Sequence, residues 1–155
     1  MGDTIPMRDA VATQMKAAMK AGEKTRVGAL RLMMAALKER EIEARGAGKI
    51  VSRADELALL TKMVKSRQES AQIYRANGRA ELAEQEEAEI AVINTFLPKQ
   101  MSEEDVIAAA KAAIAAVGAA SVRDMGKVVS QLKDGYAGQM DFGKASGLVK
   151  AALTG

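Results

Sequence analysis

Residues 96–105, with the sequence FLPKQMSEED, end one helical pattern and begin another within a few positions. Pro98 cannot donate a backbone hydrogen bond and pushes Leu97 out of helical geometry, so a helix must end there. Ser102 offers an N-cap hydroxyl, and Asp105 follows three residues later as a short capping-box acid. The acidic residues after Ser102 would also stabilise a helix that begins there, because their negative charge lies at the positive end of the helix dipole. The junction therefore predicts two helical domains, residues 1–98 and residues 99–155.

The composition favours helices along the whole chain. Ala, Leu, Met, Glu, Lys and Arg are strong helix formers, and only two prolines interrupt the 155 residues. Aromatic residues make up 3% of the chain, so we expect most of its ten methionines to fill gaps in the core beside aliphatic side chains. We expect an all-α protein, in which an N-terminal domain of about four helices precedes a small three-helix tail domain.

Apolar residues recur at helical spacing in seven segments. In the first domain we expect helices over residues 6–21, 24–45, 52–76 and 80–97. In the tail we expect helices that begin near Ser102, Ser121 and Asp141, with a loop at Asp134-Gly135 and Gly138. The expected buried face of the first tail helix is Ile107, Ala110, Ile114 and Val117. For the second tail helix it is Val122, Met125, Val129 and Leu132.

The residue content excludes several kinds of catalytic site. Cysteine and histidine are both absent, which excludes disulfides, thiolate nucleophiles, Cys/His zinc sites and imidazole acid–base chemistry. The serines fall on helices or at helix caps, unlike the Gly/Ser-rich loops of a Ser–Ser–Lys amidase. Glu86 and Glu89 lie one turn apart, yet a di-metal helical bundle would also need Glu-x-x-His pairs. We therefore predict no catalytic residue, no metal site and no cofactor.

The sequence also indicates a location. We expect no signal peptide, because the N-terminus lacks an apolar core of the needed length. No apolar run approaches the ~20 residues that a membrane span requires. The prediction is a cytoplasmic protein with no membrane partner.

Charge is distributed unevenly along the chain, whose net charge is +3. Residues 1–80 hold sixteen basic and nine acidic side chains, whereas residues 81–98 hold five Glu and no base. This arrangement could attract nucleic acid to one side of the protein, or let helices of opposite charge pair within the domain. We expect Arg31, in a basic set with Lys62, Lys65 and Arg67, to pair with a Glu of residues 80–97. Glu41 and Arg45 could pair one turn apart.

Lys127, Lys144 and Lys150 are the candidate RNA-binding residues in a tail that holds few bases. A lysine near a helix N-terminus meets phosphate as a point charge, helped by free N–H groups. Gly126 and Gly143 would let a nucleic-acid backbone come close. Alternatively, these glycines permit tight helix–helix contact and the lysines only solvate the surface. Because aromatic platforms are scarce, any RNA binding should read shape and phosphates rather than bases.

Several segments resemble the GatB/YqeY family, which includes stand-alone YqeY-like proteins. These segments are MKAAMK at 15–20, ALRLM at 29–33, GRAELA at 78–83, EEAEI at 86–90, FLPKQMSEE at 96–104, DMGKVV at 124–129, and GK at 143–144 through LVK at 148–150. Their order and separations extend over nearly the whole chain and match the stand-alone branch.

The same family includes the C-terminal region of the B subunit of aspartyl/glutamyl-tRNA amidotransferase. The resemblance implies an all-helical fold, a tail that holds tRNA, and the label of a glutamine-dependent carbon–nitrogen ligase. Catalysis in that enzyme lies in a larger B-subunit domain and a separate amidase subunit, and this chain contains neither. We expect a non-catalytic accessory protein that binds tRNA or an aminoacyl-tRNA-handling enzyme, with no DNA partner. The alternatives are a helper in tRNA amidation and a protein–protein adaptor with no RNA role.

Overall fold

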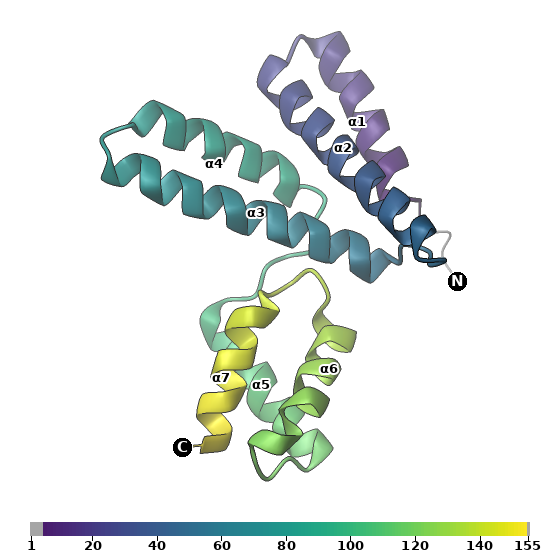
Figure 1. Cartoon of the computed structure of the whole chain (residues 1–155). Helices are drawn as coiled ribbons and strands as arrows, with labels where there is room; N and C mark the ends of the chain where they lie inside the picture. Colours follow the sequence, from purple (N-terminus) through teal and green to yellow (C-terminus); the bar gives the residue numbers. More distant parts are fainter. Residues whose placement is uncertain (1–4, 155) are drawn as a thin grey trace. The chain divides into compact units, whose positions relative to one another are not determined.

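The computed structural model describes residues 5–154, where the regular structure consists of seven α-helices and one short 3-10 helix (Figure 1). The prediction of an all-α fold is confirmed. The chain divides into two compact units, Met1–Leu97 and Pro98–Gly155. Residues 1–4 and 155, which belong to the predicted ranges 1–98 and 99–155, lie outside the described residues.

The first unit consists of two helical hairpins. Helices α1 (Met7–Ala21) and α2 (Lys24–Gly46) pack together, as do α3 (Arg53–Ala76) and α4 (Ala80–Asn94), and α2 also packs against α4 (Figure 1). Their shared core is aliphatic and methionine-rich, because the chain has few aromatic side chains. Its fully buried members include Val11, Leu30, Met33, Leu60 and Ile93.

The local sequence sets where these helices begin and end. Gly22 ends α1 at φ 73°, a left-handed conformation that glycine adopts without a Cβ penalty. A capping box begins α3: the Ser52 Oγ accepts from the Asp55 N–H at 3.1 Å, and the Asp55 carboxylate accepts from the Ser52 N–H at 3.0 Å. Helix α4 ends at Asn94 rather than at the predicted Leu97. Its last turn tightens because the N–H groups of residues 95–97 each bond three residues back, ahead of Pro98.

The tail unit contains α5 (Glu103–Val117), the 3-10 helix η1 (Val122–Asp124), α6 (Met125–Tyr136) and α7 (Phe142–Thr154). All three α-helices contact one another around a core of small and aliphatic side chains. Leu132, Val128 and Val149 are its largest fully buried members. The Met101 N–H donates to the Gln139 carbonyl at 2.9 Å and so ties the entering segment to the α6–α7 loop.

The structure corrects the predicted faces of two tail helices. Val128 is completely buried in α6, whereas Val122 is 41% exposed and Val129 is half-buried. Residues 122–124 form a 3-10 turn with about three residues per turn, so Val122 does not continue the α-helical stripe of α6. In α5 the buried residues are Val106, Ala109, Ala110 and Ala113, whereas the predicted Ile107, Ile114 and Val117 are only half-buried.

Helix α6 also runs further than the sequence predicted. The Asp134-Gly135 pair, expected in a loop, lies within its last turn, and the helix ends at Tyr136. Tyr136 packs against the tail core. Burial of this side chain therefore favours one more helical turn, despite the glycine that precedes it.

Candidate functional site

The start of α6 is closed by side chains from its own sequence. The Asp124 carboxylate accepts from the Ala120 N–H at 2.9 Å and from the Ser121 N–H at 3.4 Å. These two hydrogen bonds, the Ala120 bond first, lower the pKa of Asp124, and the nearby positive charge of Lys127 adds to the effect. Lys127 therefore stands one turn from an ionised carboxylate, yet the two form no ion pair in the described part of the chain.

Gly126 faces open space at the beginning of α6. A Cβ placed on this residue would meet nothing within 4 Å, and the residue is exposed. The interpretation that Gly126 permits tight helix–helix contact is therefore wrong. A backbone without a side chain at this position leaves room for a ligand beside Lys127.

The start of α7 is capped by Asp141. Its Oδ1 accepts from the Gly143 N–H at 2.8 Å and from the Lys144 N–H at 3.4 Å, as the sequence predicted. These N–H groups are consequently occupied, and they cannot help Lys144 bind a phosphate as expected. An anion beside Lys144 would therefore have to be held by the lysine side chain and not by these two N–H groups.

The three candidate lysines lie at different distances from the loop that connects α6 to α7. Lys127, Lys144 and Lys150 are all exposed, and none forms an ion pair or side-chain hydrogen bond within residues 5–154. Helices α6 and α7 run in opposite directions (Figure 1). Lys127 lies nine residues before the end of α6 and Lys150 eight residues after the start of α7, so both stand about 12–14 Å from the connecting loop. Lys144 lies near that loop, at the other end.

The outward face of α7 is flat between its two lysines. Lys144 and Lys150 are six positions apart and therefore about 120° apart around the helix axis. Gly147 lies between them in the helical projection and is exposed, and a Cβ added to it would meet nothing within 4 Å. Two cations thus flank a backbone surface that carries no protruding side chain.

In the first unit, opposite charges pair between α3 and α4. Arg67 Nε lies 2.9 Å from Glu89 Oε2, and Arg75 Nη2 lies 2.7 Å from Glu87 Oε1. Two of the acidic side chains of α4 therefore form ion pairs within the first unit. The expected pair between Arg31 and a Glu of α4 is wrong: Arg31 is exposed and forms no ion pair in the described residues. Arg67, from the same basic set, pairs with α4 instead, because Arg67 lies on α3 and α3 forms a hairpin with α4.

A basic pocket, which the sequence did not predict, lies where α1 begins, α2 ends and α3 begins. Its volume is about 620 Å³. It is lined by Pro6, Arg8, Glu41, Arg45, Lys49, Ile50, Val51, Arg53 and Glu56. Of the four cations that line it in the described residues, three come from residues 45–53, and this local basic cluster is the only sign of the pocket that the sequence offers. Arg8 and Glu41 are distant in sequence, so only the fold brings them to the pocket.

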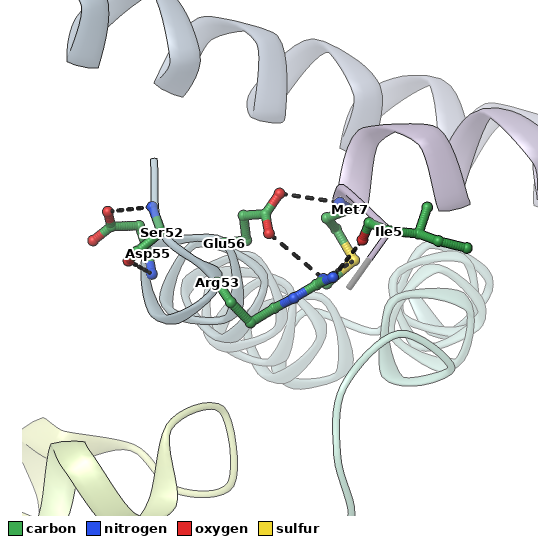
Figure 2. Close-up of polar contacts among 6 residues, drawn as sticks. All are labelled: Ile5, Met7, Ser52, Arg53, Asp55 and Glu56. Atoms are coloured by element: carbon green, nitrogen blue, oxygen red, sulfur yellow. Dashed lines mark hydrogen bonds and ion pairs between the residues drawn. The ribbon is translucent and has the colours of Figure 1, made fainter. Parts of the chain in front are cut away.

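Fixed polar contacts hold one wall of this pocket (Figure 2). The Glu56 carboxylate accepts from the Met7 N–H at 3.1 Å and lies 3.5 Å from Arg53 Nη1. Arg53 also donates to the Ile5 carbonyl. Glu41, which could have paired with Arg45, instead pairs with Arg8 at 2.6 Å. The expected Glu41–Arg45 pair is therefore wrong, because α1 brings Arg8 beside the end of α2.

Other side chains are occupied by structural contacts or lie apart. The hydroxyls of Ser52, Ser102 and Ser121 accept capping hydrogen bonds from the backbone. Within residues 5–154, no group of three or more metal-ligating side chains lies together. No single helix there is long and apolar enough to cross a membrane. The segments Glu103–Val117 and Val122–Tyr136 meet the same test only as a pair bent by 96°.

Comparison with known proteins places the chain in a family. A search of curated proteins found no match. The family model described as Yqey-like protein matches residues 8–153, which include α1 almost entirely, all of α2 to α6, and α7 except its last residue. The match therefore extends over both helical units. The chain belongs to the family of YqeY-like proteins.

Proposed function

We propose that this protein is a non-catalytic accessory factor that binds tRNA through phosphate contacts made by its tail unit. The observation that carries the proposal is the set of exposed lysines without ion-pair partners in the described residues, Lys127, Lys144 and Lys150, together with Gly126 and Gly147, which face open space. Lysine binds phosphate as a point charge, and a bare helix backbone lets a nucleic-acid strand approach closely. A cytoplasmic location, where tRNA is used, fits this role.

The resemblance to the tRNA-holding region of the amidotransferase B subunit supports tRNA as the ligand. The shortage of aromatic side chains, 3% of the chain, argues against stacking on bases. Binding should therefore depend on phosphates and shape, and its affinity should fall as salt rises, because each phosphate contact releases counterions.

The test is binding of purified protein to total tRNA over a series of salt concentrations. The Lys127→Ala, Lys144→Ala, Lys150→Ala triple variant should bind more weakly at low salt. A plot of log affinity against log salt concentration should also be less steep for this variant by about two to three, since each lysine–phosphate contact contributes about one to the slope. Retained affinity with an unchanged slope would refute the tail as the binding surface.

A matched control comes from the same unit. Lys99, Lys111 and Lys133 are exposed and lie outside the candidate set, so their triple alanine variant removes the same charge from the tail. If it weakens tRNA binding as much as the first variant, the binding is nonspecific attraction to a basic protein.

A second candidate function, a protein–protein adaptor, is favoured by one observation in the first unit. Leu32 and Ile42 of α2 are 48% and 60% exposed, and a Cβ added to Gly28, near the start of the same helix, would meet nothing within 4 Å. The two side chains lie ten positions apart on one helix, about 80° apart around its axis, and such exposed apolar side chains supply contact area for a protein partner. Affinity capture with wild-type protein and a Leu32→Ser, Ile42→Ser variant would test it: a stoichiometric protein that only the wild type captures supports this function.

A further inference from the structure

The basic pocket of the first unit carries more positive charge than its own carboxylates neutralise. Among the described residues, four cations, Arg8, Arg45, Lys49 and Arg53, line it together with two carboxylates, Glu41 and Glu56. Glu41 is held by Arg8 at 2.6 Å. Glu56 is held by Arg53 and by the Met7 N–H. The formal charge of these six described side chains is therefore +2.

The two remaining cations are available to a ligand. Arg45 and Lys49 are exposed, and neither side chain forms an ion pair or hydrogen bond in the described part of the chain. Lys49 acts on Asp55 only through space: the pKa of Asp55 is lowered mainly by hydrogen bonds from Ser52, and Arg40 and Lys49 add attraction. A guanidinium offers a planar fork of donors, and an ammonium offers a mobile point charge.

The rest of the lining is apolar. Ile50 is 93% exposed, and Val51 and Pro6 stand beside it in the same pocket. An isoleucine this exposed gains nothing from the fold itself, but it can contact the organic part of a bound molecule. A pocket of about 620 Å³ falls in the usual range for small-molecule sites.

We propose that this pocket binds a phosphomonoester that carries an apolar or ring-shaped body, such as a nucleoside monophosphate. A phosphomonoester is close to a dianion at neutral pH, which matches the excess charge of the lining. Arg45 and Lys49 bind the phosphoryl oxygens, and the wall of Ile50, Val51 and Pro6 contacts the base or sugar. Arg8 and Arg53 fix the two carboxylates, so that these do not repel the phosphoryl group.

The phosphoryl group could belong to a free nucleotide or to the 5′ end of an RNA. This pocket lies within the first unit, so the proposal is independent of the tail lysines. It can fail while tRNA binding through the tail succeeds, and the reverse also holds.

The test is isothermal titration of the full-length protein with adenosine 5′-monophosphate, with adenosine and with inorganic phosphate. The monophosphate should bind saturably and about tenfold or more tightly than either fragment alone. Equal binding of adenosine and its monophosphate would overturn the proposal, as would no saturable binding of the monophosphate. Competition by a short RNA with a 5′-phosphate, but not by its 5′-hydroxyl twin, would assign the group to an RNA end.

Variants locate the site. Arg45→Ala with Lys49→Ala should weaken monophosphate binding about tenfold or more, and the thermal melt should show that the fold persists, since both residues are exposed. The matched control is Arg31→Ala with Lys62→Ala, which removes the same charges from exposed positions of the same unit outside the pocket. Equal weakening by both pairs would refute the pocket as the site.

Discussion

Arg67 and Glu89 join α3 to α4 through an ion pair whose Nε–Oε2 distance is 2.9 Å and whose side chains are only 15% and 16% exposed. Arg67 Nη1 also donates to the Met63 carbonyl at 3.2 Å, so the guanidinium is fixed on its own helix as well. Arg75 and Glu87 connect the same two helices, but their side chains are 49% and 47% exposed. Two ion pairs of one hairpin thus differ mainly in solvent access.

Replacing Arg67 by alanine should lower the free energy of unfolding by about 1–3 kcal/mol, because it leaves the half-buried Glu89 without its partner. The Arg75→Ala change should lower it by about 0–1 kcal/mol, as expected for an exposed pair. Urea denaturation followed by circular dichroism measures both values. A double-mutant cycle with Glu89→Ala isolates the pair from the packing of the arginine stem.

Equal effects of the two arginine variants would contradict the role given to burial. So would a coupling energy near zero between Arg67 and Glu89. In either case the arginine stem, rather than the ion pair, would account for the loss.

Val128 should matter more to tail stability than its neighbour Val129. Val128 is completely buried, and its replacement by alanine removes two methyl groups and leaves a cavity, with an expected loss of roughly 2 kcal/mol. Val129 is only half-buried, so the same substitution there should lower the free energy of unfolding clearly less. Thermal or urea unfolding of the two variants compares them directly, and a larger loss at Val129 would contradict the observed face of α6.

The helices could be predicted from the sequence because their signals are local. Ser52 with Asp55, Ser121 with Asp124, and Asp141 all cap the helices that follow them, as the pattern indicated. The faces were harder to predict. Val128 and Val129 are adjacent and equally apolar, and both fit a helical stripe with Met125 and Leu132. The packing of α6 against α5 and α7, which the local pattern does not contain, decides which of them points into the core.

The candidate site could be predicted only in part. The exposure of Lys144 follows from the helical pattern. That its N–H group is occupied could be known only from the position of the Asp141 carboxylate in the structure. The choice of Arg67 over Arg31 as partner for α4 depends on which helices form a hairpin. The pocket joins Arg8 to residues 41–56, and no local pattern predicts such a contact.

Gly126→Ala should stabilise the tail. The residue is helical and its Cβ would meet open space, so alanine should raise the free energy of unfolding by about 0.5–1 kcal/mol through its higher helix propensity. The same substitution at Gly118, which has φ 65°, should instead destabilise the tail. Urea denaturation tests both. If Gly126→Ala also weakens tRNA binding while stabilising the fold, the glycine serves ligand approach rather than folding.

Asp124 should make tail stability depend on pH in the acid range. Hydrogen bonds from Ala120 and Ser121 lower its pKa below the ordinary value of 3.8, so the ionised form stabilises the folded state above that value. This stabilisation is lost as the pH falls through the folded-state pKa. The Asp124→Asn variant should therefore be less stable than wild type near neutral pH, and the difference should shrink as the pH falls below about 4.

The measurement is the urea midpoint of wild type and variant at several pH values from neutral to acid. Asp134→Asn is the matched control, since Asp134 is an exposed residue of the same unit and caps no helix in the described part of the chain. A loss of the same size in both variants would mean that removal of an acidic charge from the tail, and not of the cap, accounts for the effect. A constant difference for Asp124→Asn across the acid range would mean that the cap acts through the shape of its hydrogen bonds and not through its charge. Because Asp124 holds the turn from which α6 begins, loss of its charge should also loosen the first turns of α6, which amide hydrogen exchange at Val128 would detect.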